Sequence, residues 1–198
     1  MTKLTKRKLL CVAIIIVGIA LDFISKQIAA NNMVLHQSIP LWQDVLHITL
    51  VHNYGAAFGM MSGSRWIFIT VSVAAIISFC YYLVITKSKR PMWLYSLAMM
   101  VAGGIGNMID RIWLGYVVDF IDFTLIDFAV FNIADSFICV GAGLMMLDLV
   151  LDMIETGKEV KRENEEKARA KTAEAKTETE ETPCENEAIN NDTDSNVD

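Results

Sequence analysis

The sequence predicts an all-α polytopic membrane protein with four transmembrane helices, a small extracytoplasmic platform of strand and loops, and a C-terminal tail. Three observations lead to this class. Hydrophobic residues make up 54% of the 198 positions, the mean hydropathy is +0.39, and the apolar residues are gathered in four long segments. This composition argues against a soluble globular domain, and the lack of a basic face argues against nucleic-acid binding.

Four segments are long and apolar enough to cross the hydrocarbon core of a bilayer, which takes about 20 helical residues. They are residues 9–30, 66–86, 92–113 and 132–154. Basic residues precede the first segment, join the second to the third, and follow the fourth: Lys3, Lys6, Arg7, Lys8, Lys87, Lys89, Arg90, Lys158, Lys161 and Arg162. By the positive-inside rule, both termini and the middle loop are expected in the cytoplasm.

The first segment could also be a cleaved signal peptide, because Lys and Arg precede it and Ile28-Ala29-Ala30 resembles a cleavage site. Its apolar stretch is long, however, and carries Asp22 and Lys26 near its outer end. A retained membrane span is therefore the favoured interpretation.

The C-terminal tail differs in composition from the rest of the chain. The whole formal charge of −6 belongs to residues 158–198, so residues 1–157 form a neutral four-span membrane domain. Residues 158–176 are rich in Ala, Glu and Lys, which favours a helical extension of the fourth span. The remainder is expected to be an acidic, low-complexity and disordered cytoplasmic segment.

The two outer connections differ in character. In residues 31–65, the partly alternating stretch 46–52 predicts a short strand on the membrane face. Residues 114–131 are apolar and aromatic, as expected for a segment at the membrane interface.

Polar residues gather at one predicted depth. Because a polar side chain inside a membrane is expensive, each one calls for a reason. The topology, taken from the lysines and arginines, brings the following groups to the extracytoplasmic ends of the spans: Asp22, Asn53, Asn107, Asp110, Arg111, Asp119, Asn132 and Asp135. This shared depth is the strongest functional signal in the residues.

Three peptidase chemistries can be considered for these polar residues at one depth. A serine–lysine pair is disfavoured because Ser25 and Lys26 are adjacent on a helix and point about 100° apart. A zinc site is disfavoured because His-Glu-x-x-His is absent and His36, His47 and His52 are irregularly spaced. No metal or other cofactor is expected.

A pair of aspartates fits these polar residues better. Two carboxyl groups that share a site of low dielectric constant titrate apart, so one can take a proton from water while the other donates one to a carbonyl. Asp119 in the second outer connection and Asp135 at the top of the fourth span come from different segments, as such a dyad requires.

Four ordered motifs carry a resemblance to a known family. They are Asn53-x-Gly55-Ala-Ala-Phe, Gly106-Asn107-Met-Ile-Asp110-Arg111, Val117-Val-Asp119-Phe-Ile-Asp122 and Phe131-Asn132-Ile-Ala-Asp135-Ser. Over residues 9–155 the chain resembles the bacterial lipoprotein signal peptidases, also called signal peptidase II. The resemblance implies an aspartic endopeptidase of the bacterial inner membrane that removes signal peptides from diacylglyceryl-modified prolipoproteins, cutting before the lipidated cysteine. It also implies inhibition by globomycin-type peptides.

The resemblance assigns roles residue by residue. Asp119 and Asp135 are similar to the catalytic aspartates of the family. A supporting or substrate-binding shell is implied for Asp22, Lys26, Asn53, Gly55, Gly103, Asn107, Arg111 and Asn132. Two departures are Gly59, where the family often has serine, and the order Ala102-Gly103-Gly104-Ile105-Gly106, and both leave small residues in place.

Several residues keep a second interpretation. Asp22 and Lys26 are spaced for a plain intrahelical pair, and Asn132 could simply cap the fourth helix. Gly103 could serve helix packing, and Asp110 is expected to be structural, as an ion pair with Arg111 at the rim. The sequence gives no functional account of Asp148, Asp152 and Glu155.

Two other classes of protein would use similar residues. A small transporter or proton relay also places Asp, Asn and Lys in the membrane, but it needs polar groups at several depths. A noncatalytic scaffold could keep the fold alone, although the intact Asp119 and Asp135 argue against it.

Overall fold

The computed structural model describes residues 2–55, 65–87 and 90–180, with side chains up to residue 169. The chain forms two units, Met1–Val150 and Leu151–Asp198. The elements in chain order are α1 (Lys3–Asn32), β1 (Ser38–Trp42), β2 (Leu46–Asn53), α2 (Arg65–Ile85), α3 (Pro91–Trp113), β3 (Val117–Asp122), the short 3-10 helix η2 (Thr124–Ile126) and α4 (Ile133–Glu180). Four of these helices are long and apolar enough to cross a membrane, which confirms the predicted class.

The helices begin where the local chemistry favours them. The Thr2 hydroxyl accepts a hydrogen bond from the Thr5 N–H at 3.1 Å and caps α1. Pro91 starts α3, a position where its missing N–H leaves no helical hydrogen bond unmade. Large apolar side chains such as Ile16 on α1 and Val71 on α2 remain exposed, as expected for surfaces that face lipid.

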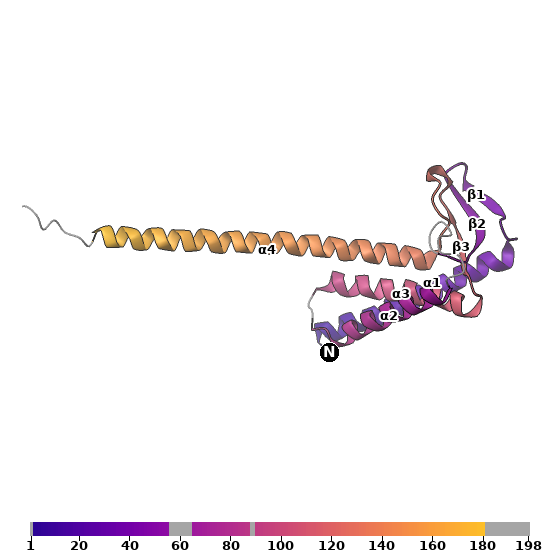
Figure 1. The fold of residues 1–198 in the computed structure, drawn as a ribbon, viewed down its shortest axis with the longest axis horizontal. Coiled ribbons are helices and arrows are strands. Elements are labelled where there is room, and N and C mark those ends of the chain that lie inside the picture. Colours follow the sequence, from indigo (N-terminus) through magenta and orange to yellow (C-terminus); the bar gives the residue numbers. More distant parts are fainter. Residues whose placement is uncertain (1, 56–64, 88–89, 181–198) are drawn as a thin grey trace, which may run out of the picture. The chain divides into compact units, whose positions relative to one another are not determined.

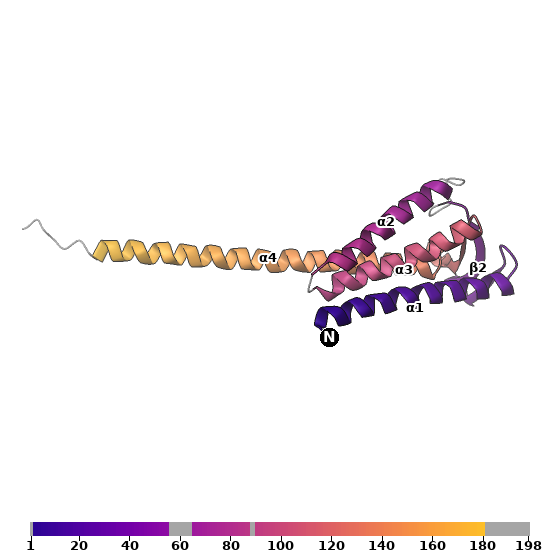
Figure 2. The same cartoon turned by 90° about the horizontal axis from the view of Figure 1, so that it is seen from below.

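Helix α3 forms the centre of the first unit. It lies between α1 and α2 in Figure 2, and Leu94, Leu97 and Ala98 on α3 pack with Cys11 of α1 and Leu83 of α2. The first turns of α4 also approach α3 closely, because a Cβ at Gly103 would meet the backbone of Ala134. Small residues allow this contact between membrane helices.

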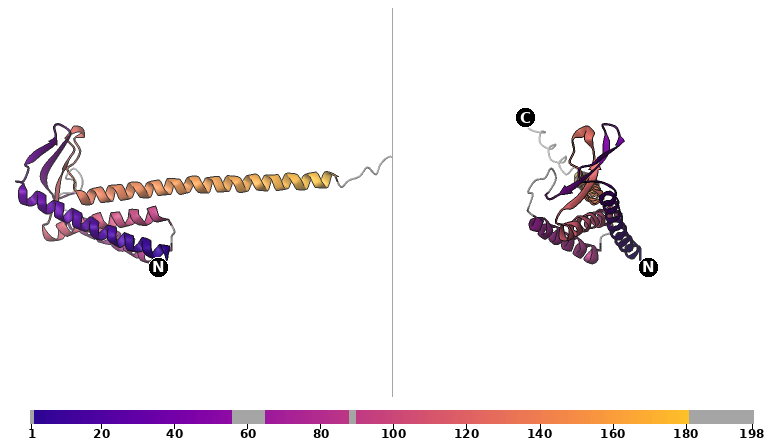
Figure 3. Two further views of the ribbon diagram at one scale, coloured as in Figure 1. Left: turned by 180° about the vertical axis from the view of Figure 1, so that it is seen from behind. Right: turned by 90° about the vertical axis from the view of Figure 1, so that its right-hand side faces the viewer.

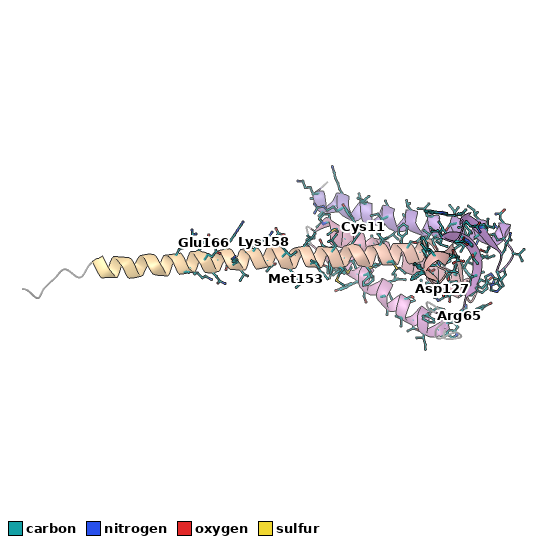
Figure 4. The ribbon with its side chains drawn as sticks, turned by 90° about the horizontal axis from the view of Figure 1, so that it is seen from above. Cys11, Arg65, Asp127, Met153, Lys158 and Glu166 are labelled. Atoms are coloured by element: carbon teal, nitrogen blue, oxygen red, sulfur yellow. The ribbon has the colours of Figure 1, made fainter. Side chains whose placement is uncertain are left out.

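A three-stranded antiparallel sheet of order β1-β2-β3 lies at one end of these helices (Figure 1). The amino end of α1 lies at the opposite end (Figure 3). Arg65 and Asp127 mark the sheet end in Figure 4, and Cys11 lies in the other half of the bundle. Leu50, Val118 and Phe120 form a small core with Ala29, which fixes the sheet on the last turns of α1.

The sheet is larger than the sequence indicated. The expected strand at 46–52 is confirmed as β2, but β1 and β3 were not predicted. Asp119 consequently lies on a strand, opposite Val51 of β2, and a register irregularity separates Ile48 from Val51. The strand pairing fixes the position of Asp119 more firmly than a loop would.

The fourth helix continues to Glu180, which confirms the helical extension predicted for residues 158–176 and takes it a few residues further. Residues 181–198, the main part of the segment expected to be disordered, lie outside the described residues. The part of α4 within the second unit carries exposed i,i+4 pairs, among them Lys161–Glu165 at 4.0 Å and Lys167–Glu163 at 3.8 Å. Pairs of this kind support an isolated helix by about 0.2–0.5 kcal/mol each.

Candidate active site

The polar residues predicted to share one depth meet at the sheet end of the first unit. They come from α1, β2, α3, β3 and the start of α4, and hydrogen bonds or ion pairs link them into one network. Folding therefore brings together groups that are as much as 113 positions apart in the chain, from Asp22 to Asp135.

The start of α4 joins Asn132 and Asp135 in a reciprocal cap. The Asp135 N–H donates to Asn132 Oδ1 at 3.0 Å, and the Asn132 N–H donates to Asp135 Oδ2 at 3.2 Å. This is the capping-box arrangement, in which two otherwise unpaired N–H groups of the first turn are satisfied. The Asp135 carboxylate also lies where the helix dipole favours negative charge.

Asp119 is buried on β3, with only 1% of its surface exposed. Its Oδ1 accepts a hydrogen bond from Asn132 Nδ2 at 2.6 Å, and its Oδ2 accepts one from Asn53 Nδ2 at 2.9 Å. Burial, with a further contribution from the negative charge of Asp135, raises the pKa of Asp119 to about 7. Asp119 is thus a carboxyl group that holds a proton near neutral pH.

Asn107 on α3 also connects Asp135 with Asp119, directly at Asp135 and through Asn132 at Asp119. Its Nδ2 donates to Asp135 Oδ1 at 2.7 Å, while its Oδ1 accepts from Asn132 Nδ2 at 3.1 Å. Asn132, which is fully buried, therefore contacts both aspartates directly and Asn107 as well. Asn107, Asn132 and Asp135 thus form a closed ring of hydrogen bonds, to which Asp119 is attached through Asn132.

Lys26 on α1 contacts this ring at Asn107 and is 2% exposed. Its Nζ lies 2.8 Å from Asp22 Oδ2, 3.0 Å from Asp110 Oδ2 and 3.0 Å from Asn107 Oδ1. The Asp22–Lys26 pair is therefore intrahelical, as expected, but it also ties α1 to α3.

Asp110 differs from the expectation of a rim ion pair with Arg111. It is buried, pairs with Lys26, and accepts a hydrogen bond from the Val118 N–H at 3.1 Å. Its position one turn beyond Asn107 on α3 directs it toward α1 and β3, a relation that residue spacing alone does not reveal.

Asp22 links α1 to the start of α4. Its Oδ1 accepts a hydrogen bond from the Ala134 N–H at 2.8 Å, one of the N–H groups that a helix leaves unpaired at its first turn. Gly106 makes room for this contact, because a Cβ there would lie 2.5 Å from Asp22 Oδ2.

Arg111 and Gly55 lie together at the edge of the network. Arg111 Nη2 donates to the Gly55 carbonyl at 3.2 Å, and the Gly55 N–H donates to Asn53 Oδ1 at 2.9 Å. The Arg111 guanidinium also lies 5.1 Å from the centre of the Phe68 ring. Residues 56–59, which complete the first motif, lie outside the described residues.

Other residues named in the sequence analysis lie outside this network. Gly103 packs against the backbone of Ala134, and Asp148 pairs with Arg90 at 2.9 Å in the other half of the bundle. Asp122 accepts a hydrogen bond from the Thr49 hydroxyl at 2.7 Å on the sheet. Within the part of the chain that the structure describes, no three His, Cys, Asp or Glu side chains are grouped as metal ligands.

The fold and the polar network define a polytopic helical membrane protein, and its solved neighbours are enzymes. One is a bacterial membrane enzyme determined by the in meso method at 2.3 Å resolution, with a TM-score of 0.69 and 32% identity over 72% of this chain and 88% of that one. A second, determined by the same method at 1.9 Å, has a TM-score of 0.65 at 32% identity.

Sequence comparison then identifies the family. The family model described as signal peptidase (SPase) II matches residues 14–151. The lipoprotein signal peptidase of Brevibacillus brevis is 43% identical over 134 residues, covering 68% of this chain and 90% of the relative. That of Bacillus subtilis is 40% identical over 144 residues, covering 71% and 93%. The chain belongs to the signal peptidase II family and is therefore a membrane protease.

Proposed function

We propose that this protein is an aspartic endopeptidase that removes the signal peptides of prolipoproteins, with Asp119 and Asp135 as its catalytic pair. The observation that carries the proposal is that one buried residue, Asn132, donates a hydrogen bond to each of these two carboxyl groups. The names of the relatives support the substrate class.

The two aspartates have different environments, which gives them different roles. Asp119 is deeply buried and its pKa is raised to about 7, so it is the proton donor. Asp135 lies in the first turn of α4 and receives N–H groups from Asn107 and Asn132, which stabilise a carboxylate. It is the general base.

The reaction follows from these roles. Asp135 takes a proton from a water molecule whose oxygen bonds to the scissile carbonyl carbon, and Asp119 gives its proton to the carbonyl oxygen, forming a gem-diol. Asp135 then gives its proton to the amide nitrogen, one hydroxyl of the gem-diol returns a proton to Asp119, and the C–N bond breaks. Both aspartates end in their starting states.

The site lies at one end of apolar helices, where the scissile bond of a membrane-anchored precursor would arrive. We place the cut immediately before the diacylglyceryl-modified cysteine, the site at the extracytoplasmic face of the inner membrane, and both termini in the cytoplasm. The distribution of Lys and Arg supports this orientation. Globomycin-type peptides are the expected inhibitors. Reporter fusions at residues 44 and 157 test the orientation, and a cytoplasmic signal at residue 44 would reverse it.

Cleavage of a lipid-modified precursor in membranes tests the function. Asp119→Asn and Asp135→Asn should each abolish processing while the protein remains inserted. Asp127→Asn is the matched control, because Asp127 is an exposed aspartate in the same connection and its left-handed backbone, with φ of 48°, suits asparagine. Undiminished cleavage by either site variant would refute the dyad. Equal cutting of an unmodified precursor would indicate a general signal peptidase.

A further inference from the structure

The buried ammonium group of Lys26 has a chemical consequence for the ring of hydrogen bonds that it contacts at Asn107. Lysine carries three N–H donors and no acceptor. Here three acceptors face it: Asp22 Oδ2 at 2.8 Å, Asp110 Oδ2 at 3.0 Å and Asn107 Oδ1 at 3.0 Å. Each of the three N–H donors of Lys26 therefore has an acceptor within the protein.

Lys26 helps to fix which way the Asn107 amide points, together with Asn132, whose own amide is oriented by the Asp135 N–H bound to its Oδ1. If the amide were flipped, its NH2 group would face both the ammonium and the Asn132 NH2 group, and three sets of donors would meet without an acceptor. Oxygen must therefore point to Lys26 and Asn132, and nitrogen must point to Asp135. The orientation follows from donor and acceptor chemistry alone.

The fixed orientation extends to the second aspartate. One hydrogen of Asn132 Nδ2 is directed to Asn107 Oδ1, which leaves the other for Asp119 Oδ1 at 2.6 Å. Lys26, which forms no ion pair with Asp119 or Asp135, thus acts with the cap at the start of α4 to direct an N–H donor to each of them.

We propose that Lys26 is a positioning residue, which orients the Asn107 amide and through it the donors to Asp119 and Asp135, rather than a residue that binds substrate. Since it acts only through a catalytic pair of aspartates, the assignment rests on the function proposed above. Its burial at 2% and its three internal partners leave no donor for a substrate group.

The test must remove the donor without leaving buried charge unbalanced. Lys26, Asp22 and Asp110 together carry a formal charge of −1, and Lys26→Met combined with Asp110→Asn keeps that value. Lys26→Met combined with Asp22→Asn also keeps it and serves as the matched second variant. Because the two double variants share only the loss of Lys26, an effect common to both belongs to that residue.

Both double variants are assayed as purified full-length chains on the lipid-modified precursor. We expect kcat to fall about 10- to 100-fold, the range that follows from small misplacements of catalytic groups, with KM within about twofold of wild type. When Lys26→Met and Asp110→Asn are added to an Asn107→Ala variant, kcat should be less than about threefold below that of Asn107→Ala alone. Lys26 is proposed to act through the Asn107 amide, which that variant has already lost.

Several results would overturn the assignment. One is a raised KM at unchanged kcat, and another is wild-type kcat in both double variants. A third is a fall in kcat in the Asn107→Ala background as large as the fall in the wild-type background. The last is absence of folded protein for both double variants, which would show that Lys26 is needed for folding. Asp119→Asn and Asp135→Asn are assayed in parallel. If these remain inactive while the Lys26 variants match wild type, only the role of Lys26 fails; if either cleaves, the proposed function fails.

Discussion

Asn132 performs two tasks, and two substitutions can separate them. Its Oδ1 accepts the Asp135 N–H and caps α4, while its Nδ2 donates to Asp119. Serine can still cap a helix but its short side chain cannot replace the donor to Asp119, whereas alanine can do neither. Asn132→Ser and Asn132→Ala should therefore lose the same catalytic interaction but differ in stability.

The magnitudes follow from the two hydrogen bonds. Loss of a helix cap costs about 1 kcal/mol, so Asn132→Ala should be less stable than Asn132→Ser by about that amount. Loss of a hydrogen bond to an ionisable group costs about 1.5–3 kcal/mol, which corresponds to about 10- to 150-fold in kcat. Both variants should show this fall.

The pH profile provides an independent readout of the same change. The Asn132 donor lowers the pKa of Asp119, which burial has raised to about 7. Without that donor the pKa of Asp119 rises further, so the high-pH limb of the kcat profile should move to higher pH while its plateau falls. Precursor cleavage between pH 5 and 9 and thermal unfolding in detergent measure the two effects. Wild-type kcat in Asn132→Ser, or activity losses that only follow stability, would refute the reasoning.

Three further predictions concern other parts of the chain. In the wild type, kcat should fall as pH rises past about 7, because Asp119 loses the proton that it donates. The free energy of unfolding should fall as pH rises from 3.8 to 7, because the folded state holds a proton on Asp119 over this range and the unfolded state does not. A profile flat to pH 9 would contradict this. Gly106→Ala should cost about 1–3 kcal/mol, because its Cβ would lie 2.5 Å from Asp22 Oδ2. The control Gly143→Ala, with nothing within 4 Å, should be neutral or stabilising by up to about 1 kcal/mol, and equal melting temperatures of the two variants would be inconsistent with the packing. Truncation after Gly157 should leave kcat within about twofold, and a larger loss would assign the tail a role in the reaction.

The spans could be predicted because a membrane imposes a length and an apolar composition on each helix by itself. The same holds for β2, whose alternation is local. The other strands depend on partners: β1 contains Pro40 and is exposed throughout, and β3 is a six-residue segment with two aspartates that pairs with β2. Neither carries a local signal strong enough to be read alone.

The residues of the site could be predicted, but the hydrogen bonds and ion pairs between them could not. Depth along each span follows from residue counting, which brought Asp22, Asn107, Asn132 and Asp135 to one level. The contacts depend on how each helix is rotated about its axis, which is set by packing such as that of Gly106 against Asp22. This is why Lys26 was expected to pair within α1 and was found to contact α3 as well.

The balance of charge in the network accounts for a proton that stays bound at neutral pH. In the described part of the site, Asp22, Asp110, Asp119 and Asp135 lie with the cations Lys26 and Arg111. If all four carboxyl groups were ionised, the cluster would hold two uncompensated negative charges at the end of a membrane bundle, which is costly. Burial and the negative charge of Asp135 raise the pKa of Asp119 to about 7, so Asp119 binds a proton near neutral pH and lowers this excess of negative charge. The excess of acids over bases in the site thus favours a bound proton on Asp119, which the proposed aspartic dyad uses as its donor.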